Sequence, residues 1–99
     1  MNWHRNLYVG EEAGKQKMKL IRQLDKQKLV FGAYVITLAA NRKDLLDVIP
    51  AFMLFRDQNA TREVIGLAVT KDEALSLCET ILSDVYQKTG SYDVRSFFA

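Results

Sequence analysis

The sequence predicts a small α+β domain with a mainly antiparallel sheet of three or four strands and two to three helices. Three observations indicate this class. The run from Lys28 to Ala40 is almost continuously apolar, which is typical of a strand covered on both faces. Two shorter strand-like runs follow, and after them comes a long amphipathic helix from about Asp72 to Thr89. With 99 residues, the chain has the size of a single domain, 1–99.

The first part of the chain is expected to hold a brief strand and one helix. Leu7–Val9 is a short apolar run that Gly10 ends, as in an edge strand or an anchored extended segment. From about Glu12 to Lys26 the residues are good helix formers. Four apolar residues fall on one side of the projected helix: Met18, Leu20, Ile21 and Leu24.

A hairpin and a short helix are expected next. Residues 41–43 form a polar connector, and Leu45–Ile49 is a second, shorter apolar run, so the connector and the two runs around it predict a hairpin. Pro50 has a fixed φ that suits the first turn of a helix. A short helix is therefore predicted from Pro50 to Phe55 or Asp57.

The third main strand is expected at Val64–Val69, and Gly66 within it indicates a bulge or a close backbone approach. A tight hairpin makes the first two main strands antiparallel. If the long apolar strand lies in the middle, the third strand pairs on its free side, antiparallel to it. The predicted order is therefore second, first, third.

The long C-terminal helix carries the clearest local signals. Thr70 and Glu73 have the spacing of a capping box, in which each side chain satisfies the other's exposed backbone N–H. Gly90 is a natural stop because glycine adopts the left-handed conformation without strain. Apolar residues occupy about half of the circumference, so we expect this helix to pack on one face of the sheet.

Composition excludes several classes of protein. No apolar stretch reaches the roughly 18 to 20 residues that cross a bilayer, and the first residues lack the apolar segment of a signal peptide. We therefore expect no membrane association and a cytoplasmic location. His4 is the only histidine and Cys78 the only cysteine, which excludes an intramolecular disulfide and a His/Cys metal cluster. No cofactor is predicted.

A basic helix face gives one candidate site. Residues 1–28 contain seven Lys/Arg and three Asp/Glu, a net charge of +4. A nucleic acid or another polyanion would relieve the repulsion between four cations that project together, opposite the apolar stripe. The alternative is an ordinary solvated face, and the stretch 10–28 has no aromatic residue that would support nucleic-acid binding. The four cations are Lys15, Lys19, Arg22 and Lys26.

Phenylalanine-rich segments give a second candidate, a surface for self-association. Homodimerisation would bury them, since aromatic residues are enriched at such interfaces. The alternative is that these side chains complete the core of the monomer. The residues concerned are Phe52, Phe55, Phe97 and Phe98.

Catalytic chemistry has no obvious residues on which to rest, so an enzyme is disfavoured. Gly10–Gln16 lies where a phosphate-binding loop would occur, but it lacks the Walker spacing and contains two glutamates. Asp44 and Asp47 are interpreted as a turn residue and a solvent-facing residue. The function expected first is a non-catalytic, self-associating interaction domain. The alternatives are an accessory protein that binds nucleic acid or another polyanion, and a small-ligand or enzyme domain with a pocket at the end of Val64–Val69.

Seven short, mostly apolar stretches carry a resemblance that covers nearly the entire chain. They are Asn6–Gly10, Leu38–Ala39, Leu45–Pro50, Ile65–Ala68, Asp72–Leu75, Val85–Tyr86 and Asp93–Arg95. Together they resemble a family of small uncharacterised bacterial proteins of about this length. The resemblance implies no assigned activity, cofactor or functional residue.

Overall fold

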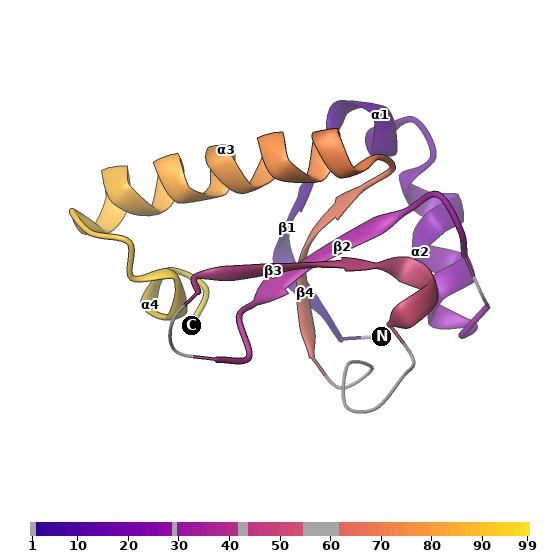
Figure 1. The fold of residues 1–99 in the computed structure, drawn as a ribbon, viewed down its shortest axis with the longest axis horizontal. Coiled ribbons are helices and arrows are strands. Elements are labelled where there is room, and N and C mark those ends of the chain that lie inside the picture. The colour runs from indigo at the N-terminus through magenta and orange to yellow at the C-terminus, as the bar shows by residue number, and fades with distance from the viewer. Residues whose placement is uncertain (1, 29, 42–43, 55–61) are drawn as a thin grey trace.

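A computed structural model describes residues 2–28, 30–41, 44–54 and 62–99, and in it a mixed sheet lies between two layers of helices (Figure 1). The strands are β1 (Asn2–Val9), β2 (Tyr34–Leu38), β3 (Leu46–Pro50) and β4 (Glu63–Ala68). The helices are α1 (Glu11–Gly14), α2 (Lys17–Asp25), the 3₁₀ turn η1 (Ala51–Met53), α3 (Lys71–Thr89) and α4 (Val94–Phe97).

The sheet has the order β1-β4-β2-β3, which confirms the α+β class and the predicted arrangement of the three main strands. β2 pairs antiparallel with β3 on one side and with β4 on the other. The expected mainly antiparallel sheet is nevertheless mixed, because β1 pairs in parallel with β4 at one edge. β1 is also much longer than the run Leu7–Val9 indicated, since its first residues are polar and carry little strand signal.

The predicted central strand begins later than expected, at Tyr34 instead of Lys28. Gly32 has a φ of +75°, which takes the backbone out of the strand conformation. Val30 and Ala33 are still buried, so the apolar run belongs to the core although its first part is not a strand.

The predicted helix 12–26 is interrupted, and α1 and α2 are separate. Gln16, which precedes α2, has the non-helical angles φ −135° and ψ 29°. Gly14, the last residue of α1, lowers the helix propensity at this point. Met18 is 64% exposed and does not belong to the apolar stripe, whereas Leu20 and Leu24 are buried.

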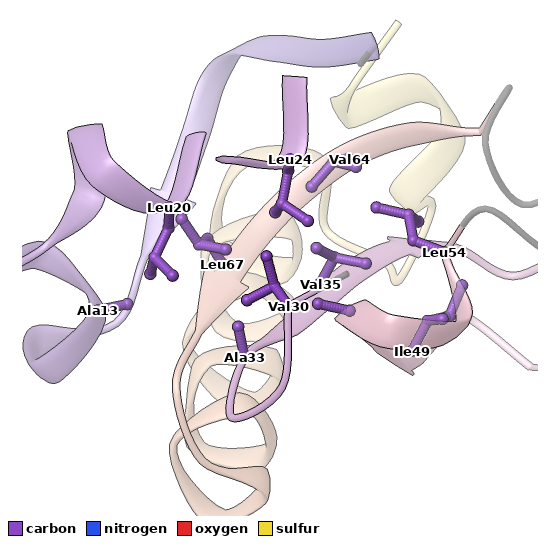
Figure 2. Close-up of a cluster of buried hydrophobic side chains, with 11 residues drawn as sticks. Ala13, Leu20, Leu24, Val30, Ala33, Val35, Ile49, Leu54, Val64 and Leu67 are labelled. Atoms are coloured by element: carbon purple, nitrogen blue, oxygen red, sulfur yellow. The ribbon is translucent and has the colours of Figure 1, made fainter. Parts of the chain in front are cut away.

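The sheet is covered on both faces, as the apolar character of β2 predicts. Val35 and Ile36 are neighbours on β2, and they belong to opposite cores. The core beneath α1, α2 and η1 is shown in Figure 2, where Leu24 points toward Val64 and Leu20 toward Leu67. The core beneath α3 and α4 contains Ile36, Ile65, Leu77, Ile81, Val85, Val94 and Phe98.

The ends of α3 confirm the predicted caps, with one change. The Glu73 N–H donates to Oγ1 of Thr70 (3.0 Å), and Gly90 has a φ of +74°. The Glu73 carboxylate does not close a standard capping box. It accepts from the Val69 N–H (2.8 Å) and also from the backbone N–H groups of Glu12 and Ala13, at the start of α1.

Pro50 ends β3, and the helix predicted after it is the 3₁₀ turn η1. Residues 55–57, to which that helix was expected to extend, lie outside the described residues. In the part of the chain that the structure describes, no helix combines the length and the apolar character needed to cross a membrane.

Candidate functional site

The structure brings three of the four predicted cations onto one exposed face. Lys19 and Arg22 lie on α2, and Lys26 caps its C-terminal end, at spacings that keep them on one side of the helix. We refer to these three residues as the α2 cations. Lys15 lies outside α2, and its Nζ is 3.3 Å from Oε1 of Glu12.

The surroundings of α2 leave this face strongly positive. Residues 15–28 contain six Lys/Arg and a single acidic residue, Asp25. Oδ1 of Asp25 accepts a hydrogen bond from Nε1 of Trp3 (2.7 Å), which connects it to β1. Within residues 2–28, 30–41, 44–54 and 62–99, none of the α2 cations forms an ion pair. An anion that binds to this face therefore does not have to displace a carboxylate of the described residues from these cations.

A groove of about 310 Å³ lies between α2 and the loop that leads to β2, and of the α2 cations Lys19 lines it. Leu20 and Val30 supply its apolar lining, and both are buried. We call this feature the α2 groove. Its polar and aromatic lining residues are Gln16, Lys19, Gln23, Lys28 and Phe31.

Phe31 is the most exposed large apolar side chain of the described residues, at 69%. Its ring stacks on that of Phe52, with centroids 5.4 Å apart and planes at 26°. The positive φ of Gly32 turns the chain after Phe31, and the Ala51 N–H donates to the Ala33 carbonyl (2.9 Å). The loop is thereby tied to η1, so an exposed aromatic ring is held at the rim of the α2 groove.

Sequence reasoning missed Phe31, Gln16, Gln23 and Lys28 as site residues. The apolar run predicts Phe31 to lie within the central strand, so the sequence offers no aromatic residue beside the basic helix face and disfavours nucleic-acid binding there. Gly32 within the apolar run was the signal that could have placed Phe31 in a loop. The loop begins where Gln27 adopts a φ of 56° and the Lys28 N–H donates to the Gln23 carbonyl (3.0 Å), a turn that no sequence motif indicates.

Of the predicted self-association residues, Phe97 and Phe98 contact each other edge-on, with ring centroids 5.0 Å apart, whereas Phe52 stacks on Phe31. Phe98 is 4% exposed and packs edge-on against His4, with centroids 5.1 Å apart, so it completes the core beneath α3 and α4. Phe97 is partly buried against the same core, and Phe52 is 36% exposed beside the α2 groove. Phe55 lies outside the described residues.

His4 links the two ends of the chain, and both of its ring nitrogens have partners. The Asn6 N–H donates to Nδ1 (3.0 Å), so the neutral ring carries its proton on Nε2, which donates to the Phe98 carbonyl (3.0 Å). A hollow of about 450 Å³ lies here, lined in part by Tyr8. Neither nitrogen is free to accept a proton from a substrate, so His4 is a structural residue in this arrangement.

A hydrogen bond connects β1 to α3: the hydroxyl of Tyr8 donates to Oδ2 of Asp84 (2.6 Å). This link is lost when the phenol is deprotonated. Burial, followed by this hydrogen bond and the charge of Asp84, raises the pKa of the Tyr8 phenol to about 12. The folded-state pKa exceeds the unfolded value of 10.0, so the link contributes fully below pH 10 and is lost as the pH rises through 12.

The Tyr8→Phe variant is therefore expected to show a weaker loss of stability than the wild type between about pH 9 and about pH 12. Urea unfolding of both proteins at the two pH values measures this difference. Equal pH dependence in the two proteins would contradict a buried, hydrogen-bonded phenol.

A pocket was expected at the end of Val64–Val69, but the hollow of about 470 Å³ beside the start of α3 is lined from the end of β1, from α1 and from α3 and by no residue of that strand. Glu11, Glu12 and Glu73 line it, so it disfavours anionic ligands. Among the described residues, no group of three His, Cys, Asp or Glu side chains is placed to hold a metal ion. Burial raises the pKa of the Cys78 thiol, which disfavours the reactive thiolate.

A second exposed apolar patch lies at the C-terminal end of α3. Leu45, Tyr86 and Tyr92 are 39%, 52% and 53% exposed, and they line a groove of about 440 Å³. The two tyrosine rings are 5.3 Å apart. We call these three residues the tyrosine patch. The helical periodicity predicts Tyr86 on the apolar half of the helix, but the structure leaves it exposed.

Comparisons of the chain with protein-family models, with curated proteins and with solved structures found no match. The resemblance to small bacterial proteins therefore stays a prediction.

Proposed function

We propose that the protein is a non-catalytic accessory protein that binds nucleic acid through the α2 cations and the α2 groove. The observation that supports this function is the position of Phe31, an exposed aromatic ring beside a helix face whose cations have no ion-pair partner among the described residues. A solvated helix face needs no such ring. Nucleic-acid sites combine both elements, because cations bind the phosphates and aromatic rings contact the bases.

The electrostatic part of the proposal concerns affinity and its dependence on salt. Each phosphate that a lysine or arginine neutralises releases condensed counterions, so binding weakens as the salt concentration rises. Lys28 adds a further cation to the lining of the groove. A cytoplasmic location, which is expected from the lack of a signal-peptide segment, would place this surface in a compartment that contains RNA.

Reversing the charges of Lys19 and Arg22 to glutamate is expected to reduce binding of a fluorescent single-stranded oligonucleotide by 10-fold or more at low salt. The slope of log affinity against log salt should become shallower by about 1.4, since about 0.7 is lost for each phosphate contact. Fluorescence anisotropy at several salt concentrations measures both quantities.

The matched control reverses Lys71 and Lys88, two exposed lysines of α3, and so changes the net charge by the same amount. This control should keep most of the affinity. Equal losses in both double variants would show that net charge alone drives binding, and unchanged affinity in the α2 variant would refute this surface.

Self-association, the function expected first from the sequence, is the second candidate. The tyrosine patch favours it, because three exposed apolar side chains gather there, and aromatic residues are enriched at protein interfaces. On this proposal, a homodimer buries Tyr86 and Tyr92 in place of the phenylalanines. Light scattering at several concentrations decides the matter, and a protein that stays monomeric at high micromolar concentration would exclude it.

A further inference from the structure

The α2 groove has the components of a site for one unpaired nucleobase. We propose that the ligand is a single-stranded nucleic acid, with one base stacked on Phe31 and the adjoining phosphates held by Lys19 and Lys28. This inference rests on the proposed function and narrows its ligand class. The observation that supports it is the stacking of Phe52 on Phe31. Although Phe52 covers part of the Phe31 ring, the Phe31 side chain stays 69% exposed.

Stacking on Phe31 discriminates between single and double strands. In a duplex, both faces of a base are covered by its neighbours, so an aromatic side chain reaches a base face only after the base has been unstacked. Unstacking and unpairing cost a few kcal/mol, whereas a single strand offers its bases at little cost. A duplex can contact the α2 cations through its phosphates, but it cannot fill the groove in the same way.

Phe52 holds the Phe31 ring in place. The two planes differ by only 26°, and the loop that carries Phe31 is tied to η1 by the hydrogen bond from Ala51 to Ala33. A base that stacks on Phe31 would therefore extend an aromatic pair that already exists. Less conformational freedom is lost on binding when the platform is ordered beforehand.

Two glutamines give the groove the capacity to contact the edge of a base. Gln16 and Gln23 are seven residues apart and line the same hollow as Lys19. In the described part of the chain, neither side-chain amide forms a hydrogen bond. An amide offers both donors and an acceptor, and the Watson–Crick edge of every base presents both kinds of group. This arrangement suits a site that accepts several bases.

The test uses wild type, Phe31→Leu and Phe31→Trp with three labelled ligands: oligo(dT), oligo(U) and a DNA duplex, each of about 12 nucleotides per strand. Leucine keeps an apolar side chain but removes stacking, whereas tryptophan restores it. We expect wild type to bind a single strand at least 10-fold more tightly than the duplex. Phe31→Leu should lose on the order of 10- to 100-fold for single strands, and Phe31→Trp should retain binding.

Several outcomes separate the inference from the proposed function. If Phe31→Leu binds like wild type, or if duplex and single strand bind equally, while charge reversal of Lys19 and Arg22 still weakens binding, the base-stacking inference is overturned and the proposed function stands. If wild type binds none of the three ligands, both fail. Tighter binding to vesicles that contain phosphatidylserine than to either single strand also overturns the inference.

Additional readouts keep the result interpretable. The salt dependence of Phe31→Leu should equal that of wild type, because no phosphate contact is removed. Circular dichroism and the urea midpoint establish that each variant is folded. A preference between oligo(dT) and oligo(U) identifies whether DNA or RNA is the better ligand, and tighter binding of either one than of the duplex supports a single-stranded site.

Discussion

Replacing Glu73 with alanine is expected to lower the free energy of unfolding by about 3 kcal/mol, more than the loss of an ordinary helix cap. The Glu73 carboxylate accepts hydrogen bonds from the backbone N–H groups of Val69, Glu12 and Ala13. The first lies before α3 and the other two lie at the start of α1. One side chain thus connects the N-terminal ends of two helices. In the alanine variant, all three backbone N–H groups lose their carboxylate acceptor.

The Glu73 carboxylate also leaves no room for a side chain at position 10, which is a glycine. A Cβ atom at Gly10 would lie 2.4 Å from Cδ and 2.7 Å from Oε1 of Glu73, so a larger residue would displace the side chain. The same geometry disfavours a phosphate site in the segment Gly10–Gln16, which follows β1. The N–H groups that would face a phosphate are already bound to an internal carboxylate.

Urea unfolding of Glu73→Ala, Glu73→Gln and Glu79→Ala measures the effect. Glutamine keeps one acceptor oxygen and loses the charge, so an intermediate loss is expected. Glu79 is exposed on the same helix and provides the matched control, with a change below about 0.5 kcal/mol. A Glu73→Ala protein as stable as the control would refute the role of this carboxylate.

Replacing Gly66 with alanine is expected to destabilise the protein by about 2 kcal/mol, through crowding between β4 and β2. A Cβ atom at Gly66 would lie 2.9 Å from Cδ1 and 3.0 Å from Cβ of Ile36. Gly66 pairs with Ile36 on β2 and with Tyr8 on β1, and register shifts lie beside both pairs. Neither neighbouring strand can move away without breaking its hydrogen bonds to β4. The side chain of Ile36, which is part of the core, would therefore have to shift.

Gly14→Ala is the matched control for this substitution. The nearest neighbour of a Cβ atom at Gly14 is Cγ1 of Val9, at 4.0 Å, which is an ordinary contact. Alanine there should leave stability unchanged or raise it by up to about 1 kcal/mol, because Gly14 is the last residue of α1. Thermal or urea unfolding of both variants checks the pair, and equal stability of Gly66→Ala and wild type would contradict the close approach.

The elements that the sequence predicted well are those determined by local signals. α3 was predicted from Thr70, Glu73 and Gly90, all within or beside the helix. β2 was recognised as a strand covered on both faces because Val35 and Ile36 are both apolar. The length and pairing of β1 were missed, since its partner β4 is more than fifty residues away in the chain and its first residues are polar.

Only the part of the candidate site that depends on local sequence could be predicted. Lys19, Arg22 and Lys26 follow from helical periodicity, which local sequence contains. The position of Phe31 depends on the positive φ of Gly32 and on packing against η1, a segment distant in sequence. Burial of Phe98 likewise depends on His4 at the other end of the chain. Contacts of this kind become visible only in three dimensions.

The central claim, that a single-stranded nucleic acid binds along α2 and the loop that carries Phe31, is tested most directly by a two-dimensional NMR titration of the labelled protein with an unlabelled single-stranded oligonucleotide. We predict that the amide signals of residues 16–32, except those of buried helix positions, shift progressively, and that those of the C-terminal half of α3 stay in place. Shifts centred on Tyr86 and Tyr92, or no shifts at all, would contradict the claim.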